Sequence, residues 1–176
     1  AETEREACIR AAMHKFGFFA MWDQIYPAKA FIAFGDTARA ERLVRYMLDY
    51  PHVEPCFWIT THLIVTADEA AGVAGEDGFL DGAYAHLKRI FDVAAGRADG
   101  KTGLLRCRNS SGVDDPKEIG IEGLVYPSCI NGWWYGACRA MENWALRRGD
   151  AATAAAARKV HEALAVRQLE LATFAA

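Results

Sequence analysis

The residues best suited to chemistry lie in one stretch of the chain, residues 109–135. A segment of small polar residues there contains two adjacent carboxylates, Asp114 and Asp115, and an aromatic cluster with Trp133 and Trp134 follows it. Carboxylates transfer protons, and aromatic rings offer flat apolar faces on which a sugar ring can stack. We therefore expect this stretch to carry a carbohydrate site, and we expect the rest of the chain to be the scaffold that positions it.

Hydrolysis of a glycosidic bond needs one carboxylic acid that protonates the leaving oxygen and a second carboxylate that acts on the opposite face. Asp114 is the first candidate for the acid and Asp115 is the second. Adjacent carboxylates oppose each other's ionisation, so one pKa of the pair is expected to rise, which suits an acid. The alternative is structural, because an Asp directly before Pro116 also caps a turn.

Polar and aromatic side chains also gather where three apolar segments begin. They are Trp22 and Asp23 in the first segment, Trp58 in the second, and Asn131, Trp133 and Trp134 in the third. If these segments are inner helices that run the same way, their starts share one rim, and convergent groups of this kind are typical of a ligand site. Structural alternatives stay open: the tryptophans could be core residues, Asp23 could cap a helix or form a buried ion pair, and Asn131 could hydrogen-bond within its first turn.

Apolar periodicity predicts seven helices and no strand. One-sided patterns predict outer helices at 2–15, 37–50, 80–95 and 151–174, and nearly continuous apolar runs predict buried inner helices at 18–34, 56–74 and 129–146. Pro27 lies inside the first inner segment, so that helix either begins near Tyr26 or kinks at the proline. Two Gly-Asp dipeptides, 35–36 and 149–150, predict matching turns in which Gly ends one helix and Asp caps the next.

This alternation predicts the fold class, which is all-α and built of helical hairpins. An inner and an outer helix in each hairpin form the unit of an (α/α)6 toroid, so we expect a partial toroid that forms a single domain over residues 1–176. The length is sufficient for one domain with a core of its own. A solenoid of stacked hairpins stays possible, because it alternates buried and exposed helices in the same way.

Composition argues against several classes of function. A net charge of −3 and a pI of about 6.0 leave no basic stripe for nucleic acid. No apolar run approaches the ~18 residues of a membrane span. The five cysteines never form a C-x-x-C pair and the histidines are scattered, so we expect reduced thiols, no metal and no cofactor, in a cytoplasmic setting.

Several short motifs, in this order, resemble the α/α-toroid glycoside hydrolases of the glucosidase and glycogen-debranching-like clan. Residues 21–36 (MWDQIYPAKAFIAFGD) are similar to the helix of that clan whose Asp contacts the sugar. Residues 103–105 (GLL) and 111–114 (SGVD) resemble the segment and loop that carry its general acid, and residues 131–150 resemble the inner helix that follows. The resemblance implies inverting hydrolysis of a small sugar or oligosaccharide, with Asp114 as the acid.

The chain departs from this clan in two respects. It supplies about three and a half of six hairpins, and the general base of the clan lies well downstream of the segment that resembles residues 131–150, so no base is assigned here. Because the chain also begins at Ala1, we expect a portion of a catalytic domain. An incomplete ring leaves apolar inner-helix surface uncovered, which predicts a homo-oligomer whose open edges cover each other.

Two alternative functions stay open. A noncatalytic carbohydrate-binding or interaction module would use the same aromatic rim without a base. A toroid sugar epimerase or isomerase would ordinarily use paired histidines on inner helices, and His62 is the one plausible member of such a pair.

Overall fold

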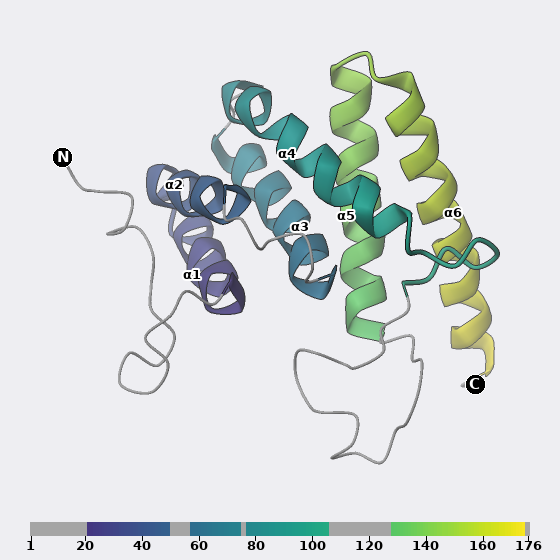
Figure 1. Cartoon of the computed structure of the whole chain (residues 1–176). Coiled ribbons are helices and arrows are strands. Elements are labelled where there is room, and N and C mark those ends of the chain that lie inside the picture. Colours follow the sequence, from purple (N-terminus) through teal and green to yellow (C-terminus); the bar gives the residue numbers. More distant parts are fainter. Residues whose placement is uncertain (1–20, 50–56, 75–76, 106–127, 175–176) are drawn as a thin grey trace. The chain divides into compact units, whose positions relative to one another are not determined.

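The described part of the chain is entirely α-helical. The computed structural model describes residues 21–49, 57–74, 77–105 and 128–174, in which six helices occur and no strand (Figure 1). The helices are α1 (Met21–Ala33), α2 (Thr37–Leu48), α3 (Phe57–Ala74), α4 (Asp77–Ala95), α5 (Ser128–Arg147) and α6 (Ala151–Phe174). The all-α prediction is confirmed, and the six expected helices within these ranges occur with small differences at their ends. The seventh, expected at 2–15, lies outside the described residues.

The described residues belong to two compact units, Ala1–Ile90 and Phe91–Ala176. The boundary falls inside α4, so the contacts of its first turns belong to the first unit and those of its last turn to the second. The single domain expected from the sequence stays a prediction.

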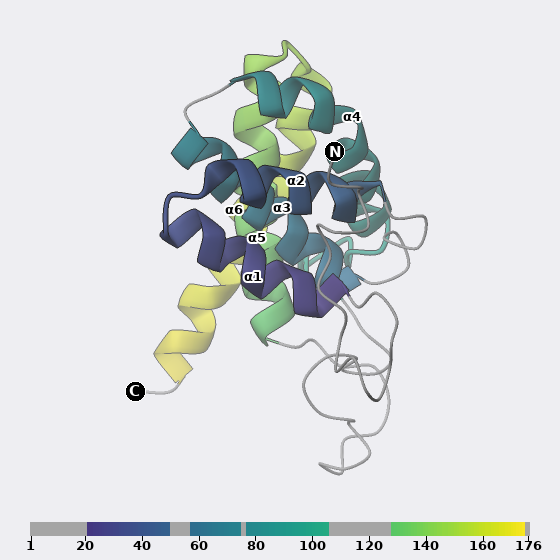
Figure 2. The same cartoon turned by 90° about the vertical axis from the view of Figure 1, so that its left-hand side faces the viewer.

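In the first unit, α1, α2 and α3 pack against one another, as Figure 1 and Figure 2 show. Tyr26 of α1 contacts His62 of α3, and Lys29, later in α1, contacts Glu69, later in α3. Residue numbers therefore increase in the same direction along both helices, so the two helices run parallel.

Contacts between α2 and α4 join Arg45 to Phe79 and Asp49 to His86, so these helices also run parallel. Gly82 has no side chain, which leaves room for the Arg45 guanidinium, because a Cβ there would lie 2.8 Å from Nη1. Parallel α1 and α3 beside parallel α2 and α4 mean that the first unit consists of two successive hairpins in the same orientation.

The second unit is built on an antiparallel hairpin of α5 and α6. The side chain of Tyr135 contacts His161, and Glu142, seven residues later, contacts Arg158, so the helices run in opposite directions. Large buried side chains of α5, including Trp134, Met141 and Trp144, form its core. Burying each such side chain stabilises the fold by ~1.5–3 kcal/mol.

The two Gly-Asp turns have the same structure, as the sequence predicts. Gly35 and Gly149 have φ of 75° and 69°, a conformation that glycine adopts without steric strain. Asp36 and Asp150 each follow with a carboxylate that accepts a hydrogen bond from a backbone N–H of the next helix, at Arg39 (3.2 Å) and Thr153 (3.0 Å). Glycine therefore ends α1 and α5, and aspartate caps the start of α2 and α6.

Pro27 lies inside α1, six residues after its first residue, Met21. The alternative in which the helix begins near Tyr26 is therefore wrong. The proline has no N–H to donate to the carbonyl of Asp23 four residues earlier, and the helix continues on both sides of this missing hydrogen bond.

The three helices that were expected to be inner helices differ in how completely their side chains are buried. In α3 the four successive residues Thr61–Ile64 are all buried, so this turn is covered on every side, as predicted. In contrast, α5 has an exposed stripe at Gly132, Arg139, Asn143 and Leu146. The expectation of complete burial is wrong for α5, because Arg139 and Asn143 recur at helical spacing and give it a polar face.

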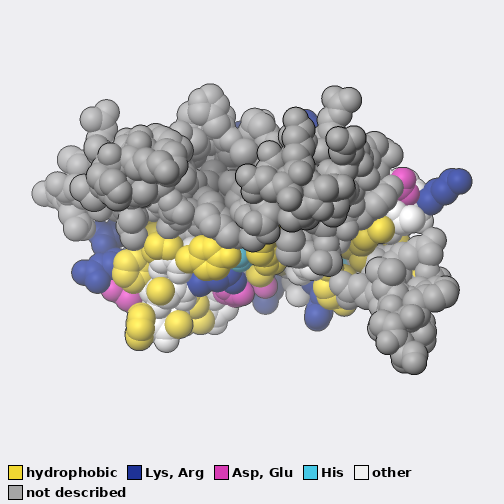
Figure 3. Space-filling view, turned by 90° about the horizontal axis from the view of Figure 1, so that it is seen from below, with side chains coloured by type: hydrophobic (Ala, Val, Ile, Leu, Met, Phe, Trp, Pro, Cys, Tyr) yellow, Lys and Arg dark blue, Asp and Glu magenta, His cyan; other side chains and the backbone are white. Residues whose placement is uncertain are grey.

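α1 also has an exposed stripe, and this one is apolar. Tyr26 is 49% exposed, Ala30 and Ala33 are exposed, and Phe34 just beyond the helix is 87% exposed. Exposed hydrophobic side chains among charged ones are also visible on the face in Figure 3. The sequence prediction of complete burial is therefore wrong for α1 as well.

Within the described ranges, none of the helices combines the length and the apolarity that crossing a membrane requires. Cys138 is a free, buried thiol on α5, and burial raises its pKa. It behaves as the small buried hydrophobe expected from the sequence.

Candidate functional site

A short loop after α4 ends at Leu105, the last described residue before segment 106–127. One carboxylate oxygen of Asp99 accepts hydrogen bonds from the backbone N–H groups of Lys101 (3.0 Å) and Thr102 (2.9 Å) and from the Thr102 hydroxyl (3.0 Å). The Asp99 N–H donates to the Leu104 carbonyl (2.8 Å), and an antiparallel bridge joins Ala98 to Leu105. The loop is therefore a tight turn held by its own aspartate.

Asn131, in the first turn of α5, holds the end of this loop. Its Oδ1 accepts a hydrogen bond from the Leu105 N–H (2.8 Å), and its Nδ2 donates one to the Leu105 carbonyl (3.2 Å). The side chain is buried, with 6% exposed, and the two residues are 26 positions apart. One amide thus satisfies both backbone groups of Leu105, and it connects the residue before segment 106–127 to the helix that begins after it.

Trp134 fixes the same loop one turn further along α5. Its indole N–H donates to the Gly103 carbonyl (3.0 Å), and its ring stacks on Phe91 with centroids 5.3 Å apart. Gly103, with φ of 70°, approaches α6 so closely that a Cβ would lie 3.4 Å from the Val160 carbonyl oxygen. Trp134 is completely buried, so it supports the loop from the core, whereas its neighbour Trp133 is partly exposed.

The remaining predicted site residues lie where side chains are not described. Asp114 and Asp115 lie outside the described residues altogether. Trp22 and Asp23 lie in the first turn of α1 and Trp58 in that of α3, and only their helical backbone is described. Because α1 and α3 run parallel, these two helix starts lie at the same end of the first unit. The predicted catalytic roles of Asp114 and Asp115 stay predictions, as do the predicted sugar contacts of the other six residues.

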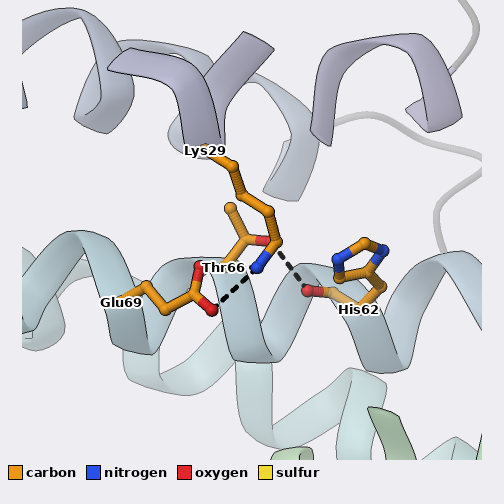
Figure 4. Close-up of polar contacts among 4 residues, drawn as sticks. All are labelled: Lys29, His62, Thr66 and Glu69. Atoms are coloured by element: carbon orange, nitrogen blue, oxygen red, sulfur yellow. Dashed lines mark hydrogen bonds and ion pairs between the residues drawn. The ribbon is translucent and has the colours of Figure 1, made fainter. Parts of the chain in front are cut away.

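A polar cluster between α1 and α3 was missed as a unit by the sequence analysis (Figure 4). Lys29 Nζ donates to both carboxylate oxygens of Glu69, at 2.7 and 2.6 Å, and Thr66 Oγ1 donates to the His62 carbonyl at 2.9 Å. Tyr26 meets the His62 ring edge-on, with centroids 5.9 Å apart. The detectable signal is a lysine in one strongly apolar segment and the Asp68-Glu69 pair in another, because charged residues in such segments usually have partners.

Burial controls the chemistry of His62. The side chain is 3% exposed, and this desolvation, followed by the nearby positive charge of Lys29, lowers its pKa to about 4. The imidazole is therefore neutral at pH 7. It can accept or donate a hydrogen bond there, but it cannot serve as a charged acid.

A second missed cluster joins α5 to α6. Oε1 of Glu142 accepts a hydrogen bond from Arg158 Nε (2.6 Å), and Oε2 of Glu142 lies 2.6 Å from His161 Nε2. The hydrogen bond with His161 is the main cause of a lowered pKa of the Glu142 carboxyl. The hydrogen bond with Arg158 and the positive charge of Arg158 lower this pKa further, and burial opposes them. The one-sided sequence pattern predicts an outer helix over this stretch, and no local signal in it indicates a partner on α5.

Comparison of the chain with protein-family models, with curated proteins and with solved structures found no match in any of the three. Among the described residues, no group of three His, Cys, Asp or Glu side chains is arranged to hold a metal ion. A functional assignment therefore depends on the residues and contacts of this chain.

Proposed function

We propose that this chain is a carbohydrate-handling portion of an α/α-toroid glycoside hydrolase, in which Asp114 is the general acid. Its ligand is a small sugar or oligosaccharide. The proposal combines the motifs of residues 21–36 and 103–150 with two features of the described structure, which are the arrangement of the hairpins and the hydrogen bonds between Asn131 and Leu105.

The arrangement of the hairpins supports the fold part of the proposal. A toroid needs inner helices that all run one way and outer helices that all run the other way. In the first unit α1 is parallel to α3 and α2 is parallel to α4, and two Gly-Asp turns of the same geometry end α1 and α5. These features also suit a solenoid, so the toroid depends in addition on the resemblance.

The single observation that carries the functional part is the hydrogen-bonded pair of Asn131 and Leu105. It brings together Leu105, the residue before segment 106–127, and the first turn of α5, and Trp133 lies in the next turn of that helix. A long segment without a predicted helix whose ends meet on a buried support is typical of a functional loop. Asp114 lies in this segment, so the proposal puts the acid on a loop that begins and ends beside an aromatic helix start.

In the proposed reaction, Asp114 donates a proton to the glycosidic oxygen as the bond to the anomeric carbon breaks. A water molecule attacks the opposite face, activated by a second carboxylate that is not assigned to a residue of this chain. Asp115 is the neighbour whose charge raises the pKa of the acid. Trp22, Asp23 and Trp58 contact the sugar from the parallel starts of α1 and α3.

A turnover assay tests the reaction. Incubation with a panel of aryl glycosides and oligosaccharides, followed by proton NMR of the released sugar, should show product whose anomeric configuration is opposite to that of the substrate. Asp114→Asn should abolish release, and Asp92→Asn, a change of an exposed residue on α4, should leave it unchanged. Binding without release by the parent chain would favour a noncatalytic carbohydrate-binding module.

A further inference from the structure

We infer that the outward face of α1, together with the end of α3, is an interface at which this chain binds a second copy of itself in two-fold symmetry. This α1 face combines exposed apolar residues with one ion pair, and its members are Tyr26, Ala30, Phe34, Val73, Lys29 and Glu69. The inference goes beyond the proposed function, because none of these residues belongs to the proposed sugar site.

The first observation is that exposed hydrophobic side chains gather on the α1 face. Among the described residues, five large hydrophobic side chains are exposed, and Tyr26, Phe34 and Val73 are three of them. Lys29 contacts Glu69, and α1 runs parallel to α3, so one turn further along the two helices we expect Ala33 beside Val73. A shared apolar face of this kind, unlike single exposed side chains, is typical of a binding surface.

The second observation is that the ion pair on this face can accept further partners. Lys29 Nζ lies 2.7 and 2.6 Å from the two carboxylate oxygens of Glu69, and 28% and 43% of these side chains are exposed (Figure 4). An ammonium group has three N–H donors and a carboxylate has about four acceptor positions, so this pair uses only part of each group. The pair therefore leaves a donor and acceptor positions that a partner of matching charge can bind.

The order of these charges favours a second copy as the partner. A two-fold axis through the α1 face turns the ion pair of the second copy around, so each lysine lies opposite the carboxylate of the other chain. The four charges then alternate in sign across the interface, which avoids contacts between like charges. A foreign partner needs an acid and a base in this same order, whereas a second copy of the chain always supplies both.

The sizes of the apolar side chains also suit packing of α1 against its copy. Tyr26 and Phe34 lie about two turns apart, and the small residues Ala30 and Ala33 lie between them. Alanines at a helix crossing let the two helices come close, because the distance between the axes depends on the side chains at the contact. The aromatic rings then fill the space where the crossed helices diverge, and their burial is the main favourable contribution to binding.

The experiment is sedimentation analysis of the full chain, without ligand, over a range of concentrations. We expect the parent to form a reversible dimer. Lys29→Glu alone, or Glu69→Lys alone, puts four like charges together at the interface and should weaken association by about tenfold or more. An equimolar mixture of the two variants should associate like the parent, because each chain then carries the charges that its partner lacks.

Two further chains separate the interface from effects on folding. The double variant Lys29→Glu, Glu69→Lys exchanges the charges, restores the ion pair within the chain and should associate like the parent. Phe34→Lys should weaken association by about tenfold or more, and because Phe34 is 87% exposed the fold does not depend on it. Its matched control is Leu146→Lys, which changes a 54% exposed side chain of the second unit and should leave association unchanged.

Three results would overturn the inference. They are a parent that stays monomeric at every concentration, a dimer that Phe34→Lys and Leu146→Lys affect equally, and single charge variants that do not regain association when they are mixed. Because no sugar is present in these measurements, each result leaves the proposed function untouched, and a failure of the sugar assays leaves this inference untouched.

Discussion

Replacing His62 by glutamine should remove a large part of the pH dependence of stability. The folded state holds His62 buried, with a pKa of about 4, whereas an unfolded histidine titrates near its ordinary value of 6.5. As the pH falls below 6.5, the unfolded state binds a proton that the folded state cannot accept until about pH 4. The free energy of unfolding is therefore fully present above pH 6.5, declines between 6.5 and 4, and is level below that range.

The magnitude follows from the difference between the two pKa values. Each pKa unit corresponds to about 1.4 kcal/mol, so the total loss is about 3 kcal/mol, of which about 2 kcal/mol occurs between pH 8 and pH 5. Lys29 lies on the facing helix and strengthens the effect, because its positive charge is the second cause of the lowered pKa. Carboxylates contribute little between pH 8 and pH 5, since most of them titrate below this interval.

Urea unfolding at pH 8, 7, 6 and 5 measures this decline in the parent and in His62→Gln. The variant is expected to be less stable overall, but its decline should be smaller by about 2 kcal/mol. Asn143→Gln, which changes an exposed side chain on α5 that does not titrate, is the control and should keep the decline of the parent. Equal declines in the parent and His62→Gln would refute the argument that burial of His62 excludes the proton.

Two further predictions concern α5 and α1. Glu142→Gln keeps the shape of the side chain but removes its charge from Arg158, and should lower the free energy of unfolding by about 1 kcal/mol at pH 7, as thermal or urea unfolding would show. The lowered pKa of Glu142 means that this difference is present above about pH 4.5 and is lost as the pH falls further, so a difference that persists at pH 2 would contradict it. Phe34→Lys should change stability by less than about 0.5 kcal/mol, because Phe34 is 87% exposed, but it puts a charge in the apolar stripe of α1 and should reduce the self-association expected from the sequence. Light scattering at rising concentration measures this, and a parent chain that stays monomeric throughout would refute the proposal.

The helices and turns could be predicted from local sequence signals. Apolar periodicity located all six helices in the described ranges, and the two Gly-Asp dipeptides located their turns, because both depend on residues a few positions apart. Burial was harder to predict. α5 was expected to be buried all round, yet it has an exposed stripe that includes Arg139 and Asn143. A helix of high overall apolar content still has a polar face when a few polar residues recur at helical spacing.

The contacts that define the candidate site could not be predicted from the sequence. Asn131 was recognised as a polar residue at a helix start, but its partner Leu105 is 26 positions away and contributes only backbone groups. The Lys29–Glu69 pair spans 40 positions. No local pattern encodes such distances, so residue type suggested where polar contacts would form, and only the packing of helices identified their partners.

The measurement that tests the central proposal most directly is the thermal stability of the parent chain and of Asp114→Asn with a panel of cationic iminosugars. A ligand at 100 times its Kd adds about 2.7 kcal/mol, which corresponds to a rise of roughly 5–10 °C in Tm for a chain of this size. We predict this rise for the parent with at least one iminosugar and its absence in Asp114→Asn, because the cation pairs with the carboxylate. Equal rises in both chains, or no rise in either with any member of the panel, would contradict the assignment of Asp114 to a working sugar site.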